Sequence, residues 1–224
     1  MPRRQENRRN SLAHPLVKRE GVTLPMTEPL NRLSSLRREI ARLVKAIDLR
    51  LVSLCAQIIR QAAQNRKTVY AFGNGGSAAL AMHLVTDLIQ ISQTSPSCPP
   101  FKAVALSDQV GVQSALANDY GHRNAFSRHL RVLAEQGDVL FGISTSGSSP
   151  NVLASLSSPS PTGLVRLGLT GARGGRMRDL CDHCLVVQSS NPFVVESVHL
   201  CFTQLLAARI RQIVGASQPT LKRS

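Results

Sequence analysis

Short runs of β-branched and other apolar residues alternate with helical segments along most of this 224-residue chain. No tight hairpin turn separates consecutive strands, so neighbouring strands should be parallel and joined by helices. This alternation predicts an α/β fold in which helices cover both faces of a five-stranded parallel sheet. The predicted strands are 68–72, 102–106, 138–143, 164–169 and 184–187, and the predicted helices are 76–90, 108–117, 122–135 and 192–214, with a loop at 92–100.

Apolar residues at steps of three and four, from Leu30 to Ile58, precede the first strand. They predict a long amphipathic helix, or two in tandem, with Thr27 as N-cap and Pro29 in the first turn. Residues 1–25 show neither helical nor strand periodicity. The predicted divisions are a disordered basic tail (1–25), an N-terminal helical segment (26–65), one α/β domain (66–215) and a flexible tail (216–224).

The net charge of +14 is concentrated at the ends of the chain. Residues 1–25 and 201–224 together supply +8 of it. A solvated tail and a solvated helix end account for this distribution. We therefore expect no nucleic-acid binding except through the basic N-terminal tail.

The five cysteines are odd in number and scattered, which favours reduced thiols and a cytoplasmic location. Cys181 and Cys184 form a lone C-x-x-C without a second pair at zinc-site spacing, so we expect them to be structural. No apolar stretch reaches the ~18 residues that a membrane span needs. The basic N-terminus lacks the apolar core of a signal peptide.

A glycine-rich turn in FGNGGSAALAMHL (72–84) joins the first strand of the sheet to the next helix. Free backbone N–H groups and the helix dipole favour an anion there, and Ser77 adds a hydroxyl. The turn also fits the dinucleotide pattern G-x-G-x-x-G/A, but the candidate acidic partner, Asp108, lies 32 residues past Gly76 rather than about 20. No G-x-x-x-x-G-K-[ST] motif for a triphosphate is present. The turn is thus expected to bind one small anionic group.

The serine-rich turn STSGSS (144–149) follows a later strand and repeats this design. Its hydroxyl groups can donate hydrogen bonds to phosphate oxygens without carrying charge. Ligands of parallel sheets bind beyond the carboxyl ends of the strands, where both turns fall. Two such turns favour a phosphorylated small molecule, although ordinary Gly- and Ser-rich β-to-α turns are an alternative.

Several further stretches accompany these turns: ALSD (105–108), ALANDYGHRNAFSRHL (115–130), GDVLFGISTSGSSPNVL (137–153) and LGLTGARGGRM (167–177). With GNGGSAALAMHL (73–84), they make residues 30–214 resemble the sugar isomerase (SIS) domain family, and within it the bacterial sedoheptulose 7-phosphate isomerases. The resemblance implies a flavodoxin-like three-layer sandwich, a homotetramer, and sites at subunit interfaces that bind a sugar phosphate.

The resemblance also assigns the substrate-binding residues by position. Those expected to line the sugar are Asn74, Gly75, Gly76, Ser77, Ser107 and Asp108, and those expected to hold the phosphate are Ser144, Thr145, Ser146 and Ser149. The second group agrees with what the hydroxyl groups of the serine-rich turn indicate.

The catalytic positions depart from the family pattern. Asp87 stands where the family has its glutamate base, so its carboxylate is one methylene shorter. Gln204 stands where the catalytic histidine is expected, and an amide cannot relay a proton near neutral pH. Glu196 replaces a glutamine, and Ile91 replaces a frequent arginine. The implied catalytic set is therefore Asp87, Glu196 and Gln204.

Zinc is the cofactor that the resemblance implies, at the positions of His83, Asp87, Glu196 and Gln204. His83 and Asp87 are four residues apart on one predicted helix, which suits shared ligation. A polar cluster at a subunit interface is the alternative. His199 is a candidate substitute for the missing catalytic acid, although the family has a histidine there without a catalytic role.

Two hypotheses follow. In the first, the protein is an aldose–ketose isomerase for sedoheptulose 7-phosphate or a related sugar phosphate, with Asp87 as base and Glu196 or a metal-bound water as its partner. In the second, it binds a phosphosugar without turnover, as do replication-initiator-associating members of the family that also lack the final histidine.

Overall fold

A computed structural model describes residues 31–95, 98–157, 162–172 and 174–215. The predicted tails at 1–25 and 216–224 and the predicted cap at Thr27 lie outside these residues. The elements are α1 (Asn31–Lys45), α2 (Leu49–Gln64), β1 (Thr68–Gly73), α3 (Gly76–Thr94), β2 (Lys102–Ala105), η1 (Leu106–Asp108), α4 (Val110–Tyr120), η2 (His122–Asn124), α5 (Ala125–Leu133), β3 (Val139–Ser144), α6 (Pro150–Leu156), β4 (Val165–Thr170), α7 (Met177–Leu180), β5 (His183–Val186) and α8 (Pro192–Ile213).

The five strands form one parallel sheet in the order β2-β1-β3-β4-β5, which confirms the predicted fold class. The chain leaves β1 toward β2 on one side and returns to β3 on the other side. The strand order therefore reverses between β1 and β3, and a crevice opens there beyond the carboxyl ends of the strands. The glycine-rich and serine-rich turns follow these two strands.

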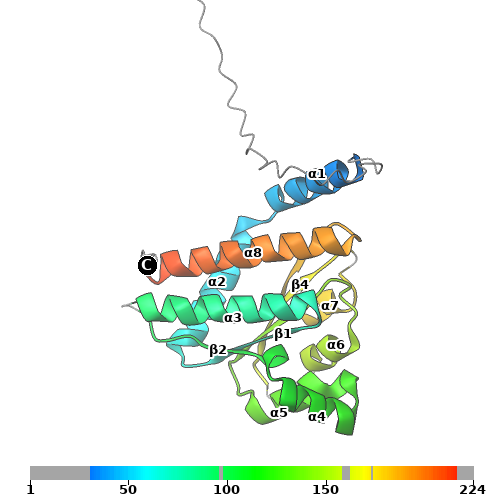
Figure 1. The fold of residues 1–224 in the computed structure, drawn as a ribbon. Coiled ribbons are helices and arrows are strands. Elements are labelled where there is room, and N and C mark those ends of the chain that lie inside the picture. The colour runs from blue at the N-terminus through cyan, green and yellow to red at the C-terminus, as the bar shows by residue number, and fades with distance from the viewer. Residues whose placement is uncertain (1–30, 96–97, 158–161, 173, 216–224) are drawn as a thin grey trace, which may run out of the picture.

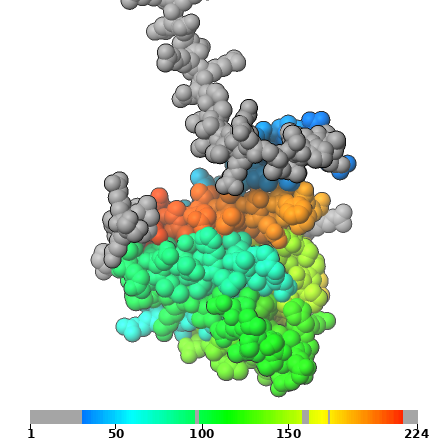
Figure 2. All heavy atoms as spheres, viewed as in Figure 1, coloured from blue at the N-terminus to red at the C-terminus, as the bar shows by residue number. Residues whose placement is uncertain are grey.

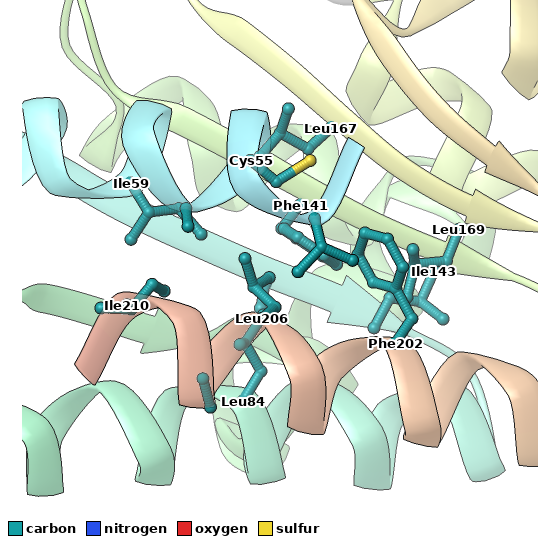
Figure 3. Packing of buried hydrophobic residues seen from close by; sticks show 14 of the residues in the cluster. Cys55, Ile59, Leu84, Phe141, Ile143, Leu167, Leu169, Phe202, Leu206 and Ile210 are labelled. Atoms are coloured by element: carbon teal, nitrogen blue, oxygen red, sulfur yellow. The ribbon is translucent and has the colours of Figure 1, made fainter. Parts of the chain in front are cut away.

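Successive residues of a strand point to opposite faces of the sheet, and the two faces carry two separate apolar cores. Val69 and Ala71 of β1 belong to the core under α2, α3 and α8, whereas Tyr70 and Phe72 belong to the core under α5, α6 and α7. Figure 3 shows the first core, where Phe141 of β3 and Phe202 of α8 lie between the sheet and the helices. Burial on both faces explains why the strands are almost continuously apolar.

Helices α3 and α8 lie side by side on one face of the molecule (Figure 1 and Figure 2). They run parallel, because Gly76 at the start of α3 faces Glu196 near the start of α8, and Asp87 further along α3 contacts Gln204 of α8. All three predicted catalytic residues, Asp87, Glu196 and Gln204, lie on these two helices.

The N-terminal amphipathic segment forms two helices rather than one. They are separated near Asp48, whose carboxylate accepts a hydrogen bond from the backbone N–H of Arg50 at 2.8 Å and so caps α2. Helix α2 packs into the core against the sheet, and α1 packs against α8 (Figure 1).

Helix α8 qualifies for a membrane span by length and composition, with a mean hydropathy of 1.3, contrary to the expectation from the sequence. Its apolar side chains instead supply much of the first core: Val194, Val195, Val198, Phe202, Leu206 and Ile210 are all buried. A long apolar helix is equally typical of the centre of a globular domain.

Candidate functional site

The glycine-rich turn needs glycine for two different reasons. At Gly73 a Cβ would lie 2.7 Å from the carbonyl oxygen of Ile143 and 2.8 Å from the Cβ of Ser77, so only hydrogen fits between β1, β3 and α3. At Gly75 the backbone has φ of +54°, a conformation that glycine adopts without strain. The turn leads directly into α3, where the N–H groups of Ser77 and Ala78 donate to the Asn74 carbonyl at 3.0 and 3.3 Å.

The serine-rich turn gathers hydroxyl groups at the end of β3. The Oγ atom of Ser144 lies 2.9 Å from Oγ of Ser149 and 3.4 Å from Oγ of Ser146. The backbone N–H of Ser148 donates to Oγ of Ser146 at 3.2 Å. Thr145 contributes its carbonyl, which accepts from the N–H of Gly171 at 3.0 Å and fixes the turn to the end of β4. This arrangement is suited to an anion with several oxygens.

Gly147 allows a close approach within this turn. Its φ is +63°, and a Cβ there would collide with the carbonyl oxygen of Gly174. The N–H of Met177 donates to the carbonyl of Gly147 at 3.1 Å. The backbone at Gly174 and at Met177 therefore packs against Gly147 and fixes the conformation of the serine-rich turn.

Asn151 connects the two turns, which sequence reasoning missed. Its amide and that of Asn74 form a reciprocal pair, with Nδ2-to-Oδ1 distances of 2.8 and 2.9 Å. The Nδ2 atom of Asn151 also lies 3.2 Å from Nε2 of His122. Asn151 is only 1% exposed, whereas Asn74 and His122 are exposed, so a buried amide anchors two side chains at the surface of the crevice. The contact between Asn74 and Asn151 spans 77 residues, so no local sequence signal reveals it.

Ser107 lies beside the glycine-rich turn, with which it is predicted to line the sugar. Its Oγ donates to the carbonyl of Gly73 at 2.9 Å and accepts from the Gly73 N–H at 3.3 Å. Ser107, Asn74 and His122 line one small cavity of about 200 Å³. Asp108 follows on η1 and is exposed.

His83, Asp87 and Gln204 form a contiguous polar cluster. The Nε2 of Gln204 lies 2.9 Å from Nε2 of His83 and donates to Oδ2 of Asp87 at 3.1 Å. His83 Nε2 and Asp87 Oδ2 are 3.5 Å apart. Since an amide NH₂ group only donates, this contact assigns Nε2 of His83 as acceptor, which corresponds to the tautomer with its proton at Nδ1. The Asp87 side chain is 17% exposed and that of His83 is 49% exposed, so the imidazole faces solvent.

Glu196 lies apart from this cluster. Its Oε1 atom is 2.9 Å from the position that a Cβ on Gly76 would take, so the carboxylate sits against the first turn of α3. Eight residues separate Glu196 from Gln204 on α8, about 12 Å along a helix. A negative charge is favourable at a helix N-terminus. Glu196 and His83 both line a cavity of about 480 Å³, whose outer wall is α1.

His199 is not a substitute acid. It is completely buried, its Nε2–H donates to the carbonyl of Thr170 at 3.2 Å, and burial lowers its pKa to about 4. The ring is therefore neutral near pH 7. It holds the end of β4 next to the serine-rich turn.

The donors fit a zinc ion only in part. His83 and Asp87 supply two atoms that zinc prefers, and Gln204 would have to present its amide oxygen. Over the described ranges, no three His, Cys, Asp or Glu side chains are grouped so that they hold a metal ion.

Comparisons with known proteins agree with this architecture. A family model described as SIS domain matches residues 33–171. A phosphoheptose isomerase of Burkholderia pseudomallei is 34% identical over 197 residues, covering 86% of this chain and 98% of the relative. One from a Nitratiruptor species is 40% identical over 151 residues, covering 67% of this chain and 79% of the relative. The solved phosphoheptose isomerase of Neisseria gonorrhoeae superposes with a TM-score of 0.73 at 28% identity, covering 81% of this chain and 98% of that one.

Proposed function

Because the chain belongs to the SIS domain family, we propose that it is a sugar-phosphate isomerase that interconverts an aldose and a ketose. Sedoheptulose 7-phosphate is the expected ketose, since the relatives named above are phosphoheptose isomerases. The observation that carries the proposal is the pairing of Asp87 and His83 on the helix that starts at the phosphate-binding crevice.

The serine-rich turn anchors the phosphate in this proposal. The hydroxyl groups of Ser146 and Ser149 both lie within 3.4 Å of the hydroxyl group of Ser144. The binding energy of the phosphate group helps to hold the other end of the sugar in the position where the reaction takes place. The glycine-rich turn, tied to the same crevice through Asn74 and Asn151, then lines the sugar.

Asp87 and His83 carry the proton transfers. The Asp87 carboxylate takes a proton from C1 of the ketose while Nδ1–H of His83 protonates the oxygen at C2, giving an enediol. Asp87 then returns a proton to C2, and His83 removes the proton from the oxygen at C1 to leave the aldehyde. Gln204 cannot exchange protons, but its amide orients both groups through the hydrogen bonds at 2.9 and 3.1 Å.

Turnover of sedoheptulose 7-phosphate by the purified full chain tests this function. Aldose product should form with the wild type and fall by about 10²–10⁴-fold in Asp87→Asn and in His83→Phe, because each variant loses one acid–base group. Thr86→Ala, which changes the exposed neighbour of Asp87, is the matched control. Equal product from wild type and Asp87→Asn contradicts the proposal.

A bound zinc ion, a homotetrameric assembly and a cytoplasmic location are further parts of this proposal. Zinc would bind at His83 and Asp87, which is tested by comparing zinc titrations of the wild type and of His83→Phe.

A homotetramer is supported by large apolar side chains exposed on α3 and α8: Ile89, Phe193, Leu200 and Leu205. Light scattering of the full chain should report four times the monomer mass of 24.2 kDa. We expect this assembly in the cytoplasm.

A phosphosugar-binding regulator without turnover is the second candidate function. Gln204 favours this second function, because its amide occupies the third position of the cluster with His83 and Asp87 and cannot relay a proton. In that case sedoheptulose 7-phosphate would raise the melting temperature and remain unconverted. Binding of a DNA duplex that is lost on removal of residues 1–25 would assign the basic tail to a regulatory partner.

A further inference from the structure

The C-x-x-C sulfurs converge at one point of the fold, away from the phosphate-binding crevice. Cys181 follows α7 and Cys184 lies in β5, and both pack against Gly168 of β4. A Cβ on Gly168 would lie 2.6 Å from Sγ of Cys181 and 3.1 Å from Sγ of Cys184. Because glycine has no side chain, position 168 leaves room for both sulfurs beside β4.

This pair is accessible to small molecules. Both cysteines are half-buried and line a cavity of about 480 Å³. Arg178, Asp182 and Gln188 line the same cavity, so its wall is predominantly polar. A small polar or anionic molecule can therefore approach the sulfurs from solvent.

The two thiols differ in acidity. A hydrogen bond from Cys181, together with the positive charge of Arg178, lowers the pKa of Cys184, although burial opposes this shift. The same hydrogen bond, together with burial, raises the pKa of Cys181. Cys184 is thus the more acidic thiol of the pair and forms the thiolate, the nucleophilic form of cysteine, more readily than Cys181.

Other thiols lack this environment. Cys55 is buried, which raises its pKa to about 12, and burial also raises the pKa of Cys98. Neither has a positive neighbour strong enough to reverse the effect of burial. The acidic thiol and its neighbouring partner are therefore found together at Cys184 and Cys181.

We propose that Cys181 and Cys184 form a redox-active dithiol that reacts with low-molecular-weight disulfides. The Cys184 thiolate attacks one sulfur of the disulfide RSSR, forms the mixed disulfide Cys184–S–S–R, and expels RS⁻. Cys181 gives its proton to RS⁻, and its sulfur attacks Sγ of Cys184. The Cys181–Cys184 disulfide forms and a second RS⁻ leaves, which takes a proton from water. RSSR is reduced to two thiols and the protein loses two electrons.

Oxidation of the reduced full chain by glutathione disulfide tests this site. After anaerobic removal of the reductant, the protein is incubated with glutathione disulfide, quenched with acid, alkylated and mapped by mass spectrometry. The expected product is a Cys181–Cys184 disulfide that forms before Cys98 or Cys201 is modified, with three of the five thiols remaining. The wild-type map needs no variant, so a folding defect cannot obscure it.

Two single variants separate the roles of the sulfurs. Cys181→Ser should stop at a glutathione adduct on Cys184, because no second thiol is present to displace it. Cys184→Ser should give no intramolecular disulfide at Cys181 and should slow its modification, since the more acidic thiol is lost and burial still raises the pKa of Cys181. Cys98→Ser is the matched control and should leave the reaction unchanged. A persistent glutathione adduct in the wild type, or equal alkylation rates at Cys181, Cys184 and Cys98, overturns the proposal.

Discussion

Acid should destabilise the folded protein through His199. This side chain is completely buried, and burial lowers its pKa from 6.5 to about 4. Above pH 6.5 the ring is neutral in both the folded and the unfolded chain, so it adds no pH dependence. As the pH falls below 6.5, the unfolded chain binds a proton that the folded chain does not bind. The free energy of unfolding must therefore decrease until the pH reaches about 4.

The size of this effect follows from the two pKa values. Linkage gives a loss of about 2 kcal/mol at pH 5 and about 3 kcal/mol at pH 4, relative to pH 7. This is a large fraction of the 5–15 kcal/mol that is typical of folded domains. The loss should appear in urea unfolding measured by circular dichroism between pH 4 and pH 7, at one fixed protein concentration.

His199→Gln is the comparison that isolates this residue. A glutamine amide can still donate to the Thr170 carbonyl but does not titrate, so the variant should lose about 2 kcal/mol less than the wild type between pH 7 and pH 5. His129, whose pKa burial also lowers, is present in both proteins and cancels. Parallel stability curves for the two proteins over this range would refute the assignment of a neutral, buried His199.

Three further substitutions test the site. Gln204→Leu removes the amide that orients His83 and Asp87 and should lower kcat in an isomerase assay, by less than the about 10²–10⁴-fold expected for the loss of an acid–base group; an unchanged kcat would contradict the orienting role of Gln204. Gly147→Ala forces a Cβ onto the Gly174 carbonyl at positive φ; about 1–3 kcal/mol of strain should appear as lower stability and weaker binding of a sugar phosphate in calorimetry. Asn151→Leu breaks the pair with Asn74 and leaves a polar group unpaired, which should cost about 1–3 kcal/mol in urea unfolding; an unchanged midpoint would contradict the structural role of the pair.

The sequence predicts the sheet well because its signals are local. The three central strands β1, β3 and β4 end at Gly73, Ser144 and Thr170, and all five observed strands begin and end within two residues of the predicted limits. The largest error is α6 (Pro150–Leu156), a short helix that was not predicted, as was also the case for α7. Helix α3 also continues to Thr94, although Ser92–Pro100 reads as a loop. In its last turn the hydroxyl groups of Ser92 and Thr94 donate to the carbonyls of Leu88 and Ile91.

The site is predictable only where its residues are close in sequence. The hydroxyl cluster of the serine-rich turn comes from six consecutive residues, so its chemistry is visible without a structure. The contact of Gln204 with His83 spans 121 residues and depends on how α3 and α8 are offset. The same offset places Glu196 against Gly76, two helical turns from the residues with which it was grouped. Side-chain spacing along one helix cannot determine the offset between two helices.

Gly168 limits what the two cysteines can be exchanged for, and they in turn limit Gly168. While both sulfurs occupy the space beside it, a change from glycine to any other residue would place a Cβ within 3.1 Å of each of them. A side chain at position 168 and the two sulfurs therefore compete for the same volume, so Gly168→Ala should be tolerated better in a variant that has lost one of the cysteines. These three positions form one packing unit, although Gly168 lies in β4, Cys184 in β5 and Cys181 after α7.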